Sequence, residues 1–208
     1  MARPSNTAER RLQIARALLK VMARTGYAGA AVSDVAKLAQ LTPGLVHYHF
    51  KNKLEILLVA IDELEGEYQR QLDARLAAAG GDPERELRAF VDAHLRLGRD
   101  ADRGKLACWI DVSGEALREP RVKKAFARVL SRSTARLRDI LARGIASGRF
   151  RSGEPEAAAA AIVAAIQGYF VLGGTARELV PRGSAARATH AMCDGLLGLG
   201  PRTRKGDP

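Results

Sequence analysis

The sequence is poor in cysteine and in aromatic residues, and both shortages restrict the fold. Only two cysteines, Cys108 and Cys193, occur in 208 residues. Both fall in apolar helical patterns, so we expect buried thiols in a reducing compartment rather than a disulfide framework. Aromatic residues make up 5% of the chain while hydrophobic residues reach 47%. Together with plentiful alanine, this composition favours an all-α protein of packed helices over a β-sandwich.

Long apolar runs are also missing. No window approaches about 18 uninterrupted apolar residues, the length that a membrane-crossing helix needs. The N-terminus lacks the apolar segment of a signal peptide. We therefore expect no membrane span and a cytoplasmic location.

Negative charge is scarce, most of all in the first quarter of the chain. The whole sequence has 34 Lys and Arg against 23 Asp and Glu, a net charge of +11. Residues 1–55 contain nine of the basic residues and three of the acidic ones, a surplus of six. Such a basic segment suits a polyanionic partner such as nucleic acid. A generally Arg-rich proteome would explain part of the remaining excess.

Motifs for catalysis or for cofactor binding are absent as well. There is no glycine-rich phosphate loop of nucleotide-binding spacing and no nucleophile elbow. His47 and His49 lie two residues apart, which places them on different faces of a helix and makes a poor metal pair. Asp111 and Glu115 are four apart, but a solvated face or a ligand contact explains them better than acid–base chemistry. We predict no catalytic residues, no metal and no cofactor.

What the sequence does contain is a pair of short helices joined by a tight turn, within residues 31–53. Apolar residues recur at helical spacing over Val32–Ala39, and the pattern then breaks. Thr42 is suited to cap the second helix, and Pro43 suits its first position because proline has no N–H to leave unpaired. This arrangement is typical of a helix-turn-helix whose second helix enters the major groove of DNA.

The second helix has an inner and an outer face. Val46 and Phe50 lie four apart and can be buried together, which leaves its small, uncharged first turn free to meet base edges. We predict base contacts from Pro43, Gly44, Leu45 and His47. Base-edge or phosphate contacts are expected from Ser33, Thr42, Tyr48, Lys51 and Lys53.

At these residues the chain resembles the TetR/AcrR family of bacterial transcriptional regulators. The matching segments are Gly26-Tyr27, Val32-x-Asp34-Val35-Ala36, Thr42-Pro43-Gly44, Tyr48-x-Phe50, and Lys51-Asn52-Lys53 with Leu57-Leu58. Two positions depart from the family pattern: Ala31 replaces the usual Thr or Ser cap, and Gln40 replaces the usual glycine of the turn. The alternative is an αα-corner in an unrelated helical protein, which would not require Pro43, Gly44 and the flanking lysines.

Helical periodicity continues through the rest of the chain. A first helix is expected at about 7–25, ended by Gly26, and a connecting helix at 53–79. Breaks such as Gly80-Gly81-Asp82-Pro83 and Glu119-Pro120 separate the helices that follow. We predict a helix-turn-helix domain at 1–52, a helical effector-binding and dimerisation domain at 53–199, and a disordered basic tail at 200–208. The later helices are expected at 83–99, 105–117, 120–147, 156–173 and 184–199.

The second half resembles the choline-responsive, BetI-type branch of the same family. The matching segments are Trp109, Glu115–Pro120, Arg143-Gly144-x-x-x-Gly148-x-Phe150, Pro155–Ala159 and Gln167-Gly168-Tyr169. Effectors differ within this branch, so the resemblance does not imply choline here.

These resemblances imply a repressor that binds a palindromic operator as a homodimer and leaves it when a small molecule binds. An effector-independent architectural DNA-binding protein and an all-helical enzyme are the alternatives. We predict an apolar effector pocket lined by Phe90, His94, Trp109, Ser113, Leu130, Thr134, Gln167 and Phe170. Carboxylates near Trp109 mildly favour a cationic effector. We predict a four-helix dimer interface that includes Ala158, Ala161, Ile162, Ala165, Ile166, Tyr169, Ala191, Met192 and Leu196.

Overall fold

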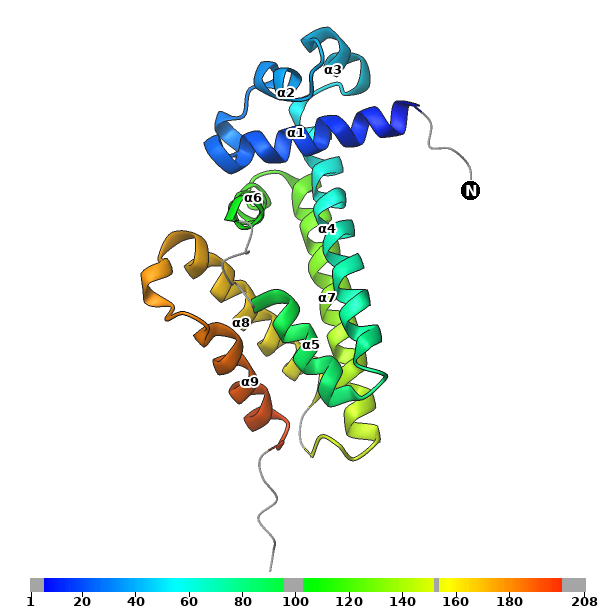
Figure 1. Ribbon diagram of the computed structural model, residues 1–208, viewed down its shortest axis with the longest axis vertical. Helices are drawn as coiled ribbons and strands as arrows, with labels where there is room; N and C mark the ends of the chain where they lie inside the picture. The colour runs from blue at the N-terminus through cyan, green and yellow to red at the C-terminus, as the bar shows by residue number, and fades with distance from the viewer. Residues whose placement is uncertain (1–5, 96–102, 152–153, 200–208) are drawn as a thin grey trace, which may run out of the picture. The chain divides into compact units, whose positions relative to one another are not determined.

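The computed structural model describes residues 6–95, 103–151 and 154–199, and within them the protein is helical (Figure 1). The described residues form nine α-helices and one short 3-10 helix, Arg177–Leu179, and contain no β-strand. This confirms the all-α prediction. The predicted tail at 200–208 and the last residues of the helix predicted at 83–99 lie outside the described residues. The helices are α1 (Asn6–Gly29), α2 (Val32–Leu38), α3 (Pro43–His49), α4 (Lys53–Ala78), α5 (Pro83–Leu95), α6 (Arg103–Glu115), α7 (Pro120–Ala146), α8 (Pro155–Thr175) and α9 (Ser184–Leu196).

The described residues pack into two compact units, each drawn from two parts of the chain. The first unit lies within Met1–Arg70 and Ala101–Leu130, and the second within Gln71–Asp100 and Ser131–Pro208. Helices α4 and α7 therefore contribute residues to both units. The domain division expected at residue 53 stays a prediction, because packing units and functional domains need not coincide.

The core of the first unit is built on the apolar stripe of α1. Ile14 and Leu18 are fully buried. They belong to one cluster with Val35 of α2, Val46 of α3 and Val112 of α6. The first turns of α4 and the start of α7 complete this cluster. The helix-turn-helix therefore shares its core with four other helices, α1, α4, α6 and α7.

The regular course of α1 breaks at Gly26, where the sequence predicts its end. Gly26 has φ 68° and ψ 170°, and one further helical turn runs to Gly29. The N–H of Tyr27 in this turn donates to the Oδ2 atom of Asp111 on α6, at 2.8 Å. Asp111 therefore bonds to backbone at the bend of α1, a contact that the sequence did not predict.

In the second unit, a close approach of Phe150 to Gly144 explains the Arg-Gly-x-x-x-Gly-x-Phe motif. A Cβ atom on Gly144 would lie 2.1 Å from the Phe150 ring. The N–H groups of Arg149 and Phe150 both donate to the carbonyl of Gly144, at 2.9 and 3.0 Å. Gly148, which has φ 70°, lets the chain turn back so that this packing forms.

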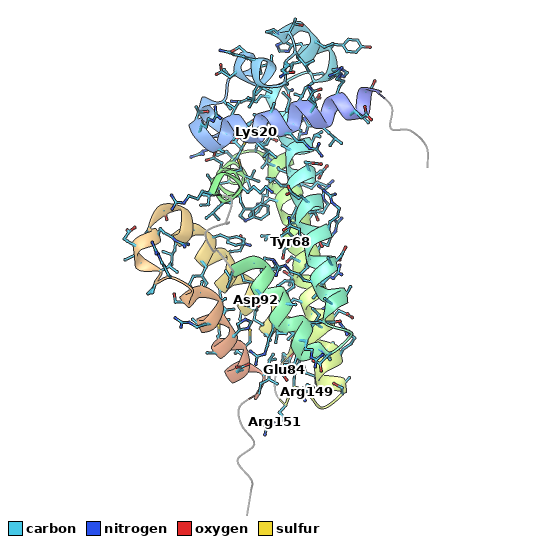
Figure 2. The ribbon with its side chains drawn as sticks, in the orientation of Figure 1. Lys20, Tyr68, Glu84, Asp92, Arg149 and Arg151 are labelled. Carbon is cyan, nitrogen blue, oxygen red and sulfur yellow. The ribbon has the colours of Figure 1, made fainter. Side chains whose placement is uncertain are left out.

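Ion pairs join α5 to its neighbours in the second unit, and Figure 2 labels two of the residues involved, Glu84 and Arg149. Glu84 pairs with Arg149 at 2.7 Å and with Arg88 at 3.3 Å. Arg88 also reaches Asp194 of α9, at 3.0 Å. Each such partly exposed pair typically contributes less than about 1 kcal/mol to the free energy of unfolding. These pairs therefore orient α5 more than they stabilise the protein.

Both cysteines are buried thiols, as predicted, and neither forms a disulfide. Burial, together with nearby Asp194, raises the pKa of the Cys193 thiol to about 12. A thiol with so high a pKa is not a nucleophile at neutral pH.

Helix α8 is unusually apolar for one that is so little buried. An 18-residue window in it has a mean hydropathy of 1.7, yet 22% of the window is buried within the chain. Among the described residues it is the one helix with the length and composition of a membrane span. Those two properties do not distinguish a membrane span from a helix that another protein surface covers.

Candidate functional sites

The helix-turn-helix forms as the sequence predicts. Thr42 caps α3, with its Oγ1 atom accepting a hydrogen bond from the N–H of Leu45 at 3.2 Å, and Pro43 opens the helix. Val46 and Phe50 are buried. The capped first turn and the two buried anchors fix which face of α3 points outward.

The two departures from the family pattern have structural consequences at the ends of α2. Ala31 provides no side-chain cap. Gln40 has φ 55°, and it is the one non-glycine residue with a positive φ in the described parts of the chain. A non-glycine residue in this left-handed region costs about 1 kcal/mol.

Helix α1 braces the C-terminal ends of both short helices, a feature that the sequence analysis missed. The Arg11 guanidinium donates to the carbonyl of His49 and lies 4.0 Å from the centroid of the Phe50 ring. The amide of Gln13 donates to the carbonyl of Ala39 at 2.7 Å. No sequence pattern indicates this brace, because helical periodicity does not show which distant carbonyl a long polar side chain reaches.

The predicted DNA-contacting residues share one property, exposure. Eight of the nine are exposed, and Lys53 is half-buried. Tyr48 is 79% and Leu45 is 38% exposed, unusual values for large hydrophobic side chains in a folded protein. The exposed residues are Ser33, Thr42, Pro43, Gly44, Leu45, His47, Tyr48 and Lys51.

Lys53 is engaged within the first unit. Its Nζ atom donates to the carbonyls of Tyr27, at 2.7 Å, and Ala28, at 3.3 Å. The same atom lies 4.5 Å from the centroid of the Tyr27 ring. Lys53 thus ties the start of α4 to the last turn of α1, and its contact with phosphate stays a prediction.

The predicted effector residues fall in both units. In the second unit, Phe90, His94 and Phe170 form an aromatic cluster, with ring centroids of His94 4.4 Å from Phe90 and 6.3 Å from Phe170. Thr134 and Gln167 belong to the same unit. Their contact with an effector stays a prediction.

His94 is held neutral at physiological pH. Its Nδ1 atom lies 2.8 Å from the carbonyl of Phe90, so the neutral ring donates from that nitrogen. Burial lowers the pKa of His94 to about 4, and the bond to Phe90 opposes only part of that effect. An uncharged imidazole among aromatic rings makes an apolar surface with one polar edge.

The remaining predicted effector residues lie in the first unit. Trp109 packs against Phe126 with ring centroids 4.7 Å apart and the rings tilted by 38°, next to the core of that unit. The hydroxyl of Ser113 donates to the carbonyl of Ile110 at 2.7 Å. Leu130 is half-buried. Because Asp111 is bonded to Tyr27, it gives less support to a cationic effector beside Trp109 than the sequence suggested.

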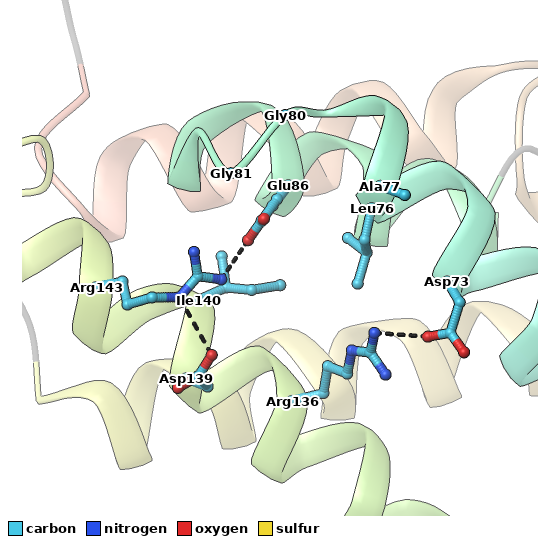
Figure 3. A pocket seen from close by; sticks show the side chains of 10 residues that line it. All are labelled: Asp73, Leu76, Ala77, Gly80, Gly81, Glu86, Arg136, Asp139, Ile140 and Arg143. Carbon is cyan, nitrogen blue, oxygen red and sulfur yellow. Dashed lines mark hydrogen bonds and ion pairs between the residues drawn. The ribbon is translucent and has the colours of Figure 1, made fainter.

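A cavity of about 890 Å³ lies in the second unit, between the end of α4, the start of α5 and the middle of α7 (Figure 3). None of the eight predicted effector residues lines it. Its charged groups are already paired: Arg136 with Asp73 at 2.6 Å, and Arg143 with Glu86 and Asp139. A ligand would have to break these pairs, so we assign them a structural role.

The predicted dimer residues are not equally available to a partner. Ala158, Ile162 and Ile166 are buried in the chain's own core. The outer face of α8 instead exposes Ala161, and Val171 at 48%. The other predicted residues are exposed or half-buried, namely Ala165, Tyr169, Ala191, Met192 and Leu196.

No group of three or more potential metal ligands occurs within the described ranges. His47 and His49 have no acidic or thiol partner that would complete such a group there.

Comparison with known proteins connects both regions to one family. Residues 14–60 match the family described as bacterial regulatory proteins of the tetR family. Residues 83–198 match the family described as the C-terminal region of BetI-type transcriptional repressors. The second match alone covers more than half of the chain.

Individual relatives agree. The chain is 26% identical over 191 residues to the HTH-type transcriptional regulator BetI of Paraburkholderia phytofirmans, covering 90% of this chain and 93% of that protein. It is 35% identical over 86 residues to BetI of Stenotrophomonas maltophilia, covering 41% and 44% of the two chains.

Solved structures show the same fold. A TetR-family regulator from a Rhodococcus species superposes with a TM-score of 0.77 at 23% identity, covering 91% of this chain and 99% of that one. A regulator from Saccharomonospora viridis, solved in complex with choline, gives 0.74 at 21% identity, covering 92% and 96%. The chain is therefore a DNA-binding transcriptional regulator that belongs to the TetR family, with a C-terminal region of the BetI-type repressors.

Proposed function

We propose that this regulator represses transcription as a homodimer, binding a palindromic operator through α3 and releasing it when a small molecule binds. The observation that carries the proposal is the outward face of the helix-turn-helix. There, the cap at Thr42 and the buried Val46 and Phe50 orient α3, and eight of the nine predicted DNA-contacting residues are exposed. Its site of action would be the cytoplasm, where the DNA is.

Exposure on α3 supports DNA binding because Leu45 and Tyr48 do not belong to the hydrophobic core of the first unit. Tyr48 and Leu45 would cost free energy as exposed apolar surface unless a partner covered them. Lys51 follows the helix and is exposed, as a phosphate-contacting residue must be.

Homodimerisation is supported by α8 and α9. The apolar composition of α8 combined with its low burial calls for a covering surface. Ala161 and neighbouring small residues would permit close helix approach, while Val171 and Leu196 would supply apolar area. A two-fold axis through these helices would present two copies of α3 to a palindrome, with half-sites about 34–36 Å apart or a multiple of that spacing.

The effector part of the proposal rests on the aromatic cluster of Phe90, His94 and Phe170. Ligand sites are lined mainly by apolar and aromatic groups with a few polar atoms. The Saccharomonospora relative holds choline, and we propose choline as the first compound to test on this chain. The proposed carrier of the signal is α4, which begins beside the helix-turn-helix and continues into the second unit.

The test begins with an operator selected from random DNA duplexes by the full-length protein. Fluorescence anisotropy on labelled operator then measures binding with and without choline and related small molecules. We expect one compound to lower operator affinity at least tenfold, with Phe170→Ala weakening that response. Operator binding that no compound alters would favour the effector-independent architectural protein.

A further inference from the structure

The recognition helix lacks the side chains that form bidentate hydrogen bonds to base edges. Over its whole length, Pro-Gly-Leu-Val-His-Tyr-His, α3 contains no Arg, Lys, Asn or Gln. These are the residues that form bidentate hydrogen bonds to guanine and adenine, the strongest means of distinguishing one base from another. The first turn of α3 therefore has to read bases in another way.

Leu45 is the residue of that turn best placed to do so. It is 38% exposed, although leucines in folded proteins are usually buried. Its backbone is fixed, because its N–H donates both to the carbonyl of Thr42 at 3.0 Å and to the Thr42 hydroxyl at 3.2 Å. The flanking Pro43 and Gly44 add no polar side-chain atom beside it.

In the major groove, the only apolar group on a base edge is the C5 methyl of thymine. A leucine exposed on this turn gains the free energy of apolar burial where such a methyl covers it. Resting on the proposed placement of α3 in the major groove, we propose that Leu45 determines operator specificity by packing on thymine methyl groups. The operator then has a thymine opposite Leu45 in each half-site.

The test removes the methyl groups one at a time. Each thymine of the selected operator is replaced by uracil, which leaves base pairing unchanged. For the wild-type protein we expect that replacing one particular thymine in each half-site lowers operator affinity about fourfold. Burying one methyl contributes ~0.8 kcal/mol, and about 1.4 kcal/mol corresponds to a tenfold change. Leu45→Ala should bind thymine and uracil operators within about 1.5-fold of each other.

Leu38→Ala is the matched control, because Leu38 is 40% exposed but belongs to α2. It should keep the wild-type preference for thymine. If Leu45→Ala binds too weakly to measure, Leu45→Val keeps part of the apolar surface and should show an intermediate ratio.

The proposal is overturned if no uracil substitution weakens wild-type binding, or if Leu45→Ala and Leu45→Val keep the full wild-type ratio. Failure of the wild-type protein to select any operator would instead contradict the proposed function.

Discussion

Gln40 occupies a backbone conformation that suits glycine. Replacing it by glycine should raise the free energy of unfolding by about 1 kcal/mol, because φ 55° then carries no Cβ penalty. Urea unfolding followed by circular dichroism measures the change. Lys37→Gly, three residues earlier in helical backbone, is the control and should lower stability by roughly 0.5–1 kcal/mol. Equal effects of the two substitutions would show that the Gln40 backbone is not strained.

Gly144 shows the opposite constraint, a position where any side chain collides. Gly144→Ala should destabilise the protein by roughly 1–3 kcal/mol, because the new Cβ overlaps the ring of Phe150. Gly114→Ala is the control, since a Cβ there meets nothing within 4 Å. The control should be neutral or slightly stabilising, because alanine favours a helix by up to about 1 kcal/mol. Thermal melts in which both variants lose the same stability would contradict this explanation of the motif.

At the scale of the elements, the position of α3 depends on α1. Arg11→Lys keeps the positive charge but loses the planar group that covers Phe50 and bonds to the carbonyl of His49. We expect operator affinity to fall about tenfold, corresponding to the loss of one charged hydrogen bond. Helix content should be unchanged.

Arg24→Lys is the matched control, because it makes the same change at an exposed cation of the same helix that carries no brace to α3. It should leave operator affinity unchanged. A loss of affinity for Arg24→Lys as large as for Arg11→Lys would show that the effect does not come from the brace.

The stability of the whole molecule should depend on pH through His94. Its pKa is about 4 in the folded protein and near its usual 6.5 when unfolded. Between these values the unfolded chain binds more protons, so stability falls as pH drops from about 6.5 to 4, by up to roughly 3 kcal/mol. Above pH 6.5 this residue contributes no pH dependence.

The measurement is the difference in unfolding free energy between pH 7 and pH 5. In His94→Phe this difference in unfolding free energy should shrink. The control is His47→Leu, a substitution of an exposed histidine, which should leave the difference unchanged. An unchanged pH dependence in His94→Phe would show that other groups cause it.

Assembly is the second property of the whole molecule that can be tested. Val171→Glu places a charge on the outer face of α8 and should convert a dimer to a monomer in sedimentation at micromolar concentration. Operator affinity should fall with it, because two half-sites are then no longer bound together. Leu117→Glu is the control, since Leu117 is 87% exposed but belongs to the first unit. A wild-type protein that sediments as a monomer would contradict the homodimer.

The sequence by itself determined the class of fold, the positions of the helices to within a few residues, and the helix-turn-helix. These depend on local physics: apolar periodicity, the cap at Thr42, proline at the start of α3, and breaks at glycine and proline. Exposure on α3 also followed from the sequence, because burying Val46 and Phe50 leaves the other face outward whatever lies beneath.

Only the tertiary structure decided which polar groups pair over long distances. The bond from Asp111 to Tyr27 and the brace from Arg11 to α3 join residues far apart in the chain, which the sequence cannot place together. The tertiary structure also decided which face of α8 is buried, because this helix is apolar on both faces. Ile162 and Ile166 point into the core while Val171 points outward, because the direction of a uniformly apolar helix is set by its neighbours and not by its own periodicity.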